Sequence, residues 1–302
     1  MFKLKFLAVI LPVIPFLHAT AQCPGNVASL HVRVIQRSLV VVPVRINHSG
    51  PYDMVVDTGA QVTTIDPGLS AELRLPTEGT AGVIGAGVYE RDALIRLDLL
   101  EAGSQVVERA LAVVADLREL QAADKNIRGI LGSNFLGHFD MLLDYAHGAL
   151  CLDGGNRLEQ KVKGEHIALI KGSKSDGDLP YPERCVIAVR VSGAKARDLH
   201  LILDSGSNAP LLFDRALLPV DLSPKNAVLT RVNGNGIEQK FAVLTAPNIQ
   251  VGKHSFHRIP FVTPIYTGRD VPKLQEDGLL PTVLFQWIYI NHSQAYAVIE
   301  PW

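Results

Sequence analysis

Short apolar runs, separated by turn residues, make up most of the chain after its first thirty residues. Residues 31–36 and 39–46 either alternate apolar with polar positions or run apolar throughout, which is typical of strands. Residues 47–51 combine Asn, Ser, Gly and Pro, which favour a turn, and residues 52–56 continue as a further strand. Long helical periodicities are missing and Val is abundant, so the pattern predicts a β-rich fold.

Three short segments carry helix signals instead. We expect a helix over residues 66–73, because Asp66 is a good N-cap and Pro67 suits the first helical position. A second short helix is predicted over residues 116–123, and Ser133 is expected to cap a third.

Glycines alternate with Val, Ile and Tyr over residues 79–90. A Gly-Ala-Gly sequence also occurs in phosphate-binding loops, but such a loop needs a strand before it and a helix after it. Here residues 93–99 follow and alternate like a strand, so a β-hairpin is the better interpretation. Residues 231–236 contain Asn-Gly twice and predict a second hairpin in the other half of the chain.

Residues 54–60 and 201–207 share one pattern, an apolar strand that ends in an acid and is followed by a hydroxyl residue and Gly. Gly permits a tight reversal, and the hydroxyl can bond backbone within its own turn or across to a neighbouring one. One such turn is a weak signal, because a strand end with a capping Asp looks the same. Two of them in matched surroundings predict a device that holds two carboxylates rigidly. We call the two segments the acid turns: Asp57-Thr58-Gly59-Ala60 and Asp204-Ser205-Gly206-Ser207.

The surroundings of the two acid turns match. Each turn is followed, at nearly the same spacing, by Gly and two apolar residues, in residues 129–132 and 278–281. Further apolar strands come at residues 141–145 and 288–292, so the chain contains an internal repeat, which indicates two copies of one small fold. The copies differ outside the acid turns: Pro281 replaces Gly132, and Asn291-His292 replaces Asp144-Tyr145. We therefore expect the second copy to differ in geometry and to keep its chemistry.

With these motifs in both halves, the chain resembles an aspartic peptidase of the pepsin/retropepsin superfamily, in a bacterial-type, signal-bearing, two-lobed form. The resemblance implies a mostly β fold of two retropepsin-like lobes of the closed β-barrel type, in a pepsin-like bilobal arrangement with a few short helices. It implies a catalytic pair, Asp57 and Asp204, that activates a water to hydrolyse peptide bonds. The hairpin at residues 79–90 becomes a mobile flap over the site, where Tyr89 either lines the site or is an ordinary cross-strand aromatic. The flap candidates are Gly85, Gly87 and Tyr89.

The residues beside the two acids receive supporting roles from the same resemblance. The hydroxyls are expected to bond across a pseudo-two-fold axis, and the glycines to offer backbone N–H groups to the carboxylates. Ser207 has a hydroxyl that could donate to Asp204, whereas Ala60 has none for Asp57, so we expect Asp204 to ionise first. The site-supporting candidates are Thr58, Gly59, Ala60, Ser205, Gly206 and Ser207.

We divide the chain into a signal peptide (1–21), an N-terminal lobe (29–155), a linker (156–183) and a C-terminal lobe (184–302). A positive start at Lys3 and Lys5, a short apolar core and an Ala-x-Ala sequence indicate the signal peptide, and hence export to the periplasm or the medium. A membrane anchor is disfavoured because two prolines interrupt a run that is short for a span. Gln22 before Cys23 disfavours a lipoprotein signal.

Composition narrows the classes of function. The chain of 302 residues is 47% hydrophobic, and its net charge of −1 argues against a nucleic-acid binder or a polybasic membrane-surface protein. His254 and His257 have a spacing that would suit a metal on a helix, but their neighbours alternate as in a strand, so we predict no metal and no cofactor. Three cysteines leave at least one thiol free or paired between chains, with a Cys151–Cys185 or a Cys23–Cys185 bridge left open.

Two other functions compete with a peptidase that binds a polypeptide substrate. The first is a non-catalytic module that keeps the fold and holds peptides or a partner protein. The second is a subunit with one acid turn that must dimerise. The duplication removes that need, so we expect a monomer with both acids in one chain.

Overall fold

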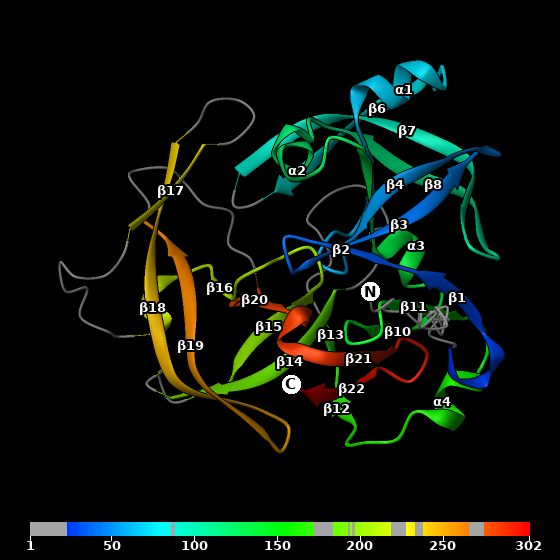
Figure 1. The fold of residues 1–302 in the computed structure, drawn as a ribbon. Helices are drawn as coiled ribbons and strands as arrows, with labels where there is room; N and C mark the ends of the chain where they lie inside the picture. The colour runs from blue at the N-terminus through cyan, green and yellow to red at the C-terminus, as the bar shows by residue number, and fades with distance from the viewer. Residues whose placement is uncertain are drawn as a thin grey trace, which may run out of the picture.

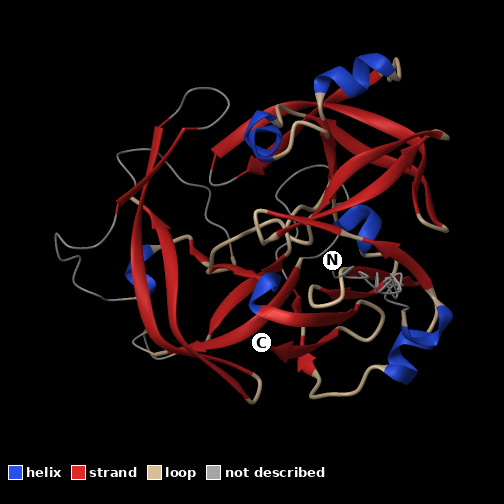
Figure 2. Cartoon of the chain, viewed as in Figure 1, coloured by secondary structure: helices blue, strands red, loops and turns tan. Residues whose placement is uncertain are grey.

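The computed structural model describes residues 23–85, 88–171, 184–192, 194, 197–218, 228–232, 238–265 and 275–302. The segment predicted as a signal peptide lies outside these residues, as does Gly87. The described strands form three β-sheets, and the helices between them are short (Figures 1 and 2).

The first half of the chain forms an eight-stranded sheet in the order β2-β3-β4-β9-β5-β8-β7-β6. Because β3 also pairs with β7, the six strands β3, β4, β9, β5, β8 and β7 close into a barrel. The strands of this sheet are β2 Arg33–Ile35, β3 Leu39–Ile46, β4 Ser49–Val56, β5 Thr63–Ile65, β6 Thr77–Gly85, β7 Val88–Ala102, β8 Gln105–Val114 and β9 Ile127–Leu131.

The second half repeats this topology strand for strand, in the order β13-β14-β15-β20-β16-β19-β18-β17. The pairing of β14 with β18 closes its barrel as the β3–β7 pairing closes the first. The prediction of a mostly β fold with two closed-barrel lobes and a few short helices is therefore confirmed. The strands are β13 Ile170–Lys171, β14 Cys185–Val191, β15 Leu199–Asp204, β16 Leu211–Leu212, β17 Val228–Val232, β18 Glu238–Val251, β19 His254–Pro264 and β20 Gly278–Pro281.

A third sheet, which we call the inter-lobe sheet, joins the two halves and runs beside both barrels (Figure 1). Its strand order is β1-β11-β10-β21-β22-β12, so each half contributes three strands. Sequence analysis predicted strands at residues 141–145 and 288–292, but not this sheet. The strands are β1 Ala28–His31, β10 Asp140–Asp144, β11 Ala149–Asp153, β12 Ile167–Ala168, β21 Phe285–Asn291 and β22 Tyr296–Pro301.

The register of the central pair of the inter-lobe sheet reveals a pseudo-two-fold axis. In the antiparallel β10–β21 ladder, Leu142 lies opposite Tyr289, and Leu143 lies opposite Ile288. The offset between Leu142 and Tyr289 equals the offset of 147 residues between Thr58 and Ser205 in the acid turns. The same axis therefore relates the strands of the inter-lobe sheet and the two acid turns.

The two faces of the inter-lobe sheet bury different clusters. Alternate residues such as Met141 and Leu143 join the main core with the barrels, whereas Leu142, Cys151 and Tyr289 face the other way into a smaller cluster. Helix α4 packs on that outer face and contributes the fully buried Leu158.

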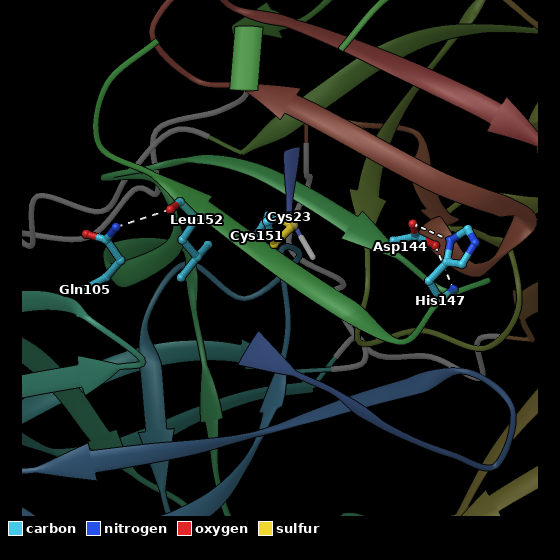
Figure 3. Close-up of a disulfide and its surroundings, with 6 residues drawn as sticks. All are labelled: Cys23, Gln105, Asp144, His147, Cys151 and Leu152. Atoms are coloured by element: carbon cyan, nitrogen blue, oxygen red, sulfur yellow. Dashed lines mark hydrogen bonds and ion pairs between the residues drawn. A yellow bond between two sulfur atoms is a disulfide. The ribbon is translucent and has the colours of Figure 1, made fainter. Parts of the chain in front are cut away.

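The cysteine pairing differs from both bridges that the sequence left open. Cys23 forms a disulfide with Cys151 on the outer face of the inter-lobe sheet (Figure 3), and Cys185 is a buried free thiol. Strand β1 pairs with β11 so that Ser29 lies opposite Cys151, which brings the start of the described chain back over this sheet. Both expected alternatives were wrong because each used Cys185, which lies at the start of β14 in the second barrel.

All three predicted helices are present, and one of the two predicted caps differs. Asp66 caps α1 and accepts a hydrogen bond from the Leu69 N–H at 3.0 Å, as predicted. Ser133 is the first residue of α3 and not its cap, because its hydroxyl donates to another part of the chain. The helices are η1 Pro24–Asn26, α1 Pro67–Glu72, α2 Arg118–Ala123, α3 Ser133–Leu136, α4 Arg157–Lys161, η2 Arg215–Leu217 and η3 Thr282–Leu284.

Several expectations fall wholly or partly outside the described residues. Within the segment assigned to a linker, α4, β12 and β13 are described up to residue 171, and the domain limits themselves stay a prediction. Strands β6 and β7 form the expected hairpin, with Ile84 opposite Tyr89 and Gly85 opposite Val88. Strands β17 and β18 form the second hairpin, whose tip at residues 233–237 is not described.

Candidate active site

Each acid turn follows a buried strand at the point where that strand pairs in parallel with a second one. Val56 lies opposite Leu131 in the β4–β9 ladder, and the Asp57 N–H donates to the Leu131 carbonyl at 3.1 Å. Asp204 ends β15 opposite Pro281 of β20. Because the three residues before each acid are apolar and buried, the two carboxyl groups are carried on the rigid part of each barrel.

The hydroxyls of the two turns make reciprocal hydrogen bonds. The Thr58 N–H donates to the Ser205 hydroxyl and the Ser205 N–H to the Thr58 hydroxyl, each at 3.1 Å. The Thr58 hydroxyl in turn donates to the Leu203 carbonyl at 2.7 Å, and the Ser205 hydroxyl donates to the Val56 carbonyl at 2.8 Å. Both hydroxyl residues are buried, so these four bonds fix one turn against the other.

The glycines allow each carboxyl group to lie against the opposite turn. A Cβ added at Gly206 would meet Asp57 Oδ2 at 2.3 Å, and one added at Gly59 would meet Asp204 Cγ at 2.7 Å. The carboxyl groups of Asp57 and Asp204 are close enough that each shifts the pKa of the other. A side chain at either glycine would therefore force the two acids apart.

Backbone groups bind both carboxylates. Asp57 Oδ1 accepts from the Gly59 N–H at 2.8 Å and from the Ala60 N–H at 2.9 Å. Asp204 Oδ1 accepts from the Gly206 N–H at 2.7 Å. The N–H groups of the glycines thus point where the sequence led us to expect them, with Ala60 contributing its N–H as well.

The hydroxyl of Ser207 does not bind Asp204, contrary to our expectation. It donates to the Ala209 carbonyl at 2.8 Å, closing a local turn, as Ser side chains often do. Burial raises the pKa of both acids, and the charge of Asp57 raises the pKa of Asp204 further. Without the Ser207 bond, the reason for expecting Asp204 to ionise first is absent, and the two acids titrate as one pair that shares a proton.

The raised pKa of Asp204 has a consequence for stability. A carboxyl group whose pKa is higher in the folded than in the unfolded chain stabilises the fold below its unfolded pKa of about 3.9, and that contribution is lost as pH rises through the folded pKa. The Tm of the wild type, minus that of Asp204→Asn, should therefore fall as pH rises from acid to neutral. Thermal unfolding of both proteins over this pH range measures it; a difference that stays constant or grows would contradict the raised pKa.

Further hydrogen bonds tie the first acid turn to the loop that follows β9. The Ser133 N–H donates to the Ala60 carbonyl at 2.8 Å, and the Ser133 hydroxyl donates to the Thr58 carbonyl at 3.1 Å. A Cβ at Gly132 would lie 2.6 Å from the Val62 carbonyl carbon, so this loop can approach the turn only with Gly at that position. The second copy has Pro281 at the corresponding position, opposite Asp204.

The remaining candidates lie elsewhere. His254 and His257 are in β19, and no group of three or more metal-ligating side chains occurs among the described residues. No described helix is long and apolar enough to cross a membrane.

A pocket of about 410 Å³ opens on the outer face of the inter-lobe sheet, beside the disulfide and Trp287, and neither acid turn contributes to it. Sequence reasoning missed a contact between Tyr145 and Thr282, because no motif links them.

Comparisons with known proteins agree with the acid-turn motif. Residues 42–135 match the aspartyl protease family, a span that runs from β3 to α3 and includes the first acid turn. The resemblance to aspartic peptidases of the pepsin/retropepsin superfamily is thereby confirmed. A retropepsin-like aspartic protease from Rickettsia conorii is a similar solved structure, with 18% identity and a TM-score of 0.31 over 42% of this chain and 90% of that one. No curated protein matches the chain.

Proposed function

We propose that this protein is an aspartic endopeptidase in which Asp57 and Asp204 together activate a water. The observation that carries the proposal is a pair of carboxyl groups, Asp204 buried and Asp57 half-buried, that lie against each other's turns, with reciprocal hydroxyl contacts between the turns. Two like charges about 4 Å apart cost roughly 4 kcal/mol at an effective dielectric near 20, so the pair shares one proton over its working range. It therefore offers a base and an acid side by side.

In the proposed mechanism, ionised Asp57 takes a proton from a water held between the carboxyl groups. The water oxygen attacks the scissile carbonyl carbon while protonated Asp204 donates a hydrogen bond to the carbonyl oxygen, which stabilises the tetrahedral intermediate. A proton from the pair then passes to the leaving amine as the C–N bond breaks. The carboxyl pair ends with one proton, as it began, and no covalent bond to the enzyme forms.

The substrate would be a polypeptide bound in extended form. Extended peptides add to strand edges through backbone hydrogen bonds, and pockets read alternate side chains. The β6–β7 hairpin offers such an edge, because β6 is the last strand of its sheet. The duplicated barrel supplies both acids in one chain, so we propose that the active form is a monomer.

Export to the periplasm or the medium is also proposed. It rests on the signal-like residues 1–21, and the Cys23–Cys151 disulfide supports it, because disulfides persist in oxidising compartments.

Incubation of the purified protein with an unfolded protein or a peptide library, from acid to neutral pH, tests the proposal directly. We expect new termini, detected by mass spectrometry, and inhibition by a statine-type peptide, whose hydroxyl mimics the tetrahedral intermediate. A chain that binds these peptides but yields no fragment at any pH would instead be the non-catalytic module.

Inhibitor binding should also close the β6–β7 hairpin. A closed flap excludes water from the site, so the backbone amides of residues 79–85 should exchange more slowly with a statine-type inhibitor bound. Hydrogen exchange with and without inhibitor measures this, and the second hairpin, β17–β18, serves as the internal comparison. If the exchange rates of residues 79–85 are the same with and without inhibitor, these residues do not act as a flap.

A further inference from the structure

A side chain from the first half of the chain reaches the loop that follows β20 in the second half. Tyr145 comes directly after β10, and its hydroxyl lies 2.6 Å from the hydroxyl of Thr282, the first residue of η3. The Tyr145 N–H donates to the Gln286 carbonyl at 2.9 Å, which fixes the backbone of Tyr145 against the second half. Thr282 is completely buried, so its hydroxyl needs a partner inside the protein.

Thr282 occupies a place that corresponds to Ser133 in the first half. Ser133 follows Gly132, and Thr282 follows Pro281, which lies opposite Asp204 in the β15–β20 ladder. In the first half the Ser133 hydroxyl donates to the acid turn itself, at the Thr58 carbonyl. The Thr282 hydroxyl therefore occupies the position from which the Ser133 hydroxyl supports the first acid turn.

The second loop uses its hydroxyl differently. Proline at position 281 has no N–H group, and its Cβ could not make the close approach that Gly132 makes to Val62 in the first half. Among the hydrogen bonds of the described residues, the side chain of Thr282 bonds to Tyr145 and to no atom of the second acid turn. Direct support of the turn by the loop hydroxyl is thus replaced by a bond to the other half of the molecule.

Tyr145 also lies within electrostatic reach of the acid pair. Burial and the charge of Asp204 raise the pKa of Tyr145, so its phenol stays protonated and can donate over the whole pH range in which the pair works. The ring packs against the main core that both barrels share.

We propose that Tyr145 is a positioning residue for the second acid turn. It holds Thr282, and thereby the segment opposite Asp204, in place of the direct hydroxyl bond that Ser133 gives the first turn. The catalytic consequence rests on the proposed peptidase function, whereas the structural one does not. The two acid turns are then held by different contacts. The second turn depends on Tyr145, which belongs to the first half of the chain.

Hydrogen exchange of assigned backbone amides tests the structural part without any activity. In Tyr145→Phe and Thr282→Val, the Gly206 amide should exchange about fivefold faster or more, the factor that one buried hydrogen bond contributes to an opening equilibrium. The Gly59 amide of the first turn should change much less. Ser133→Ala should reverse the pattern, with Gly59 affected more than Gly206.

An unchanged Gly206 amide in the folded variants, or equal acceleration at Gly59 and Gly206, would overturn the proposal. Thr282→Val decides the matter if Tyr145→Phe does not fold. Tyr52→Phe is a matched control, because Tyr52 lies in β4 of the first barrel and its hydroxyl binds the exposed Glu72.

Kinetics test the catalytic part. Tyr145→Phe should lower kcat about tenfold with KM changed less than about twofold, because a displaced acid weakens the transition state more than substrate binding. Thr282→Ser keeps the hydroxyl and should retain activity, and the Tyr145→Phe, Thr282→Val double variant should be no worse than either single variant. Additive losses, or a change in KM alone, would contradict a positioning role. If the wild type cleaves no peptide, the proposed peptidase function is wrong. The exchange experiment would still decide whether Tyr145 holds the second acid turn.

Discussion

Asp57→Asn and Asp204→Asn should each lower kcat/KM for peptide cleavage by about a thousandfold or more, since acid–base groups contribute up to about 10⁴-fold. Hydrolysis by a shared proton needs one acid and one base, and either amide leaves only one carboxyl group. Steady-state cleavage of a peptide found in the library experiment measures the loss. Both variants should fold, because an amide fits the space of a carboxyl group that is already neutral or hydrogen-bonded.

Asp53→Asn is the matched control for this experiment. Asp53 lies in the same strand as the residues that lead to Asp57, but its side chain is 35% exposed and pairs with Arg33. Its loss should leave kcat/KM within about twofold of the wild type, as for most exposed ion pairs. Near-normal cleavage by Asp57→Asn or by Asp204→Asn would rule out the proposed mechanism.

The second large effect concerns stability. Removing the Cys23–Cys151 disulfide should lower the free energy of unfolding by up to about 5 kcal/mol, because a bond across 128 residues strongly restricts the unfolded chain. Denaturant unfolding of the oxidised protein, the reduced protein and the Cys23→Ser, Cys151→Ser variant measures it. The reduced protein and the variant should agree, since Cys185 has no part in the bond.

A fall of less than about 1 kcal/mol in both cases would contradict this estimate. It would mean that β1 and the residues before it contribute little to the stability of the rest of the fold. The disulfide would then only attach a segment that is already partly unfolded.

The acid turns were predictable because their function requires a local sequence. An apolar strand, an acid, a hydroxyl and Gly all lie within a few residues, and each has a role that does not depend on the rest of the fold. The cap of α1 by Asp66 was predictable for the same reason. The match of the two halves then predicted two barrels, since a repeated pattern implies a repeated fold.

What the sequence could not predict were contacts whose partners are set by tertiary structure. From the sequence, the Ser207 hydroxyl could donate to the Asp204 carboxyl group or to backbone in its own turn. It donates to the Ala209 carbonyl, which is nearer in sequence. Ser133 has the sequence of a helix cap, yet its hydroxyl donates a hydrogen bond to the Thr58 carbonyl, far away along the chain. Cysteine pairing needed the β1–β11 register, which no local pattern gives.

The β10–β21 ladder at the centre of the inter-lobe sheet bears on how the chain is made. Strand β11 follows β10 at once and pairs with one edge of it, but the partner for its other edge begins only at Phe285. Until that point has been synthesised, β10 is an open edge strand beside the first barrel, with backbone groups free to pair. Long-range pairing of this kind forms slowly, so a half-made chain is exposed during that interval to pairing with another half-made chain. The strand that unites the two lobes in the finished protein is thus the position where an unfinished one is most able to dimerise.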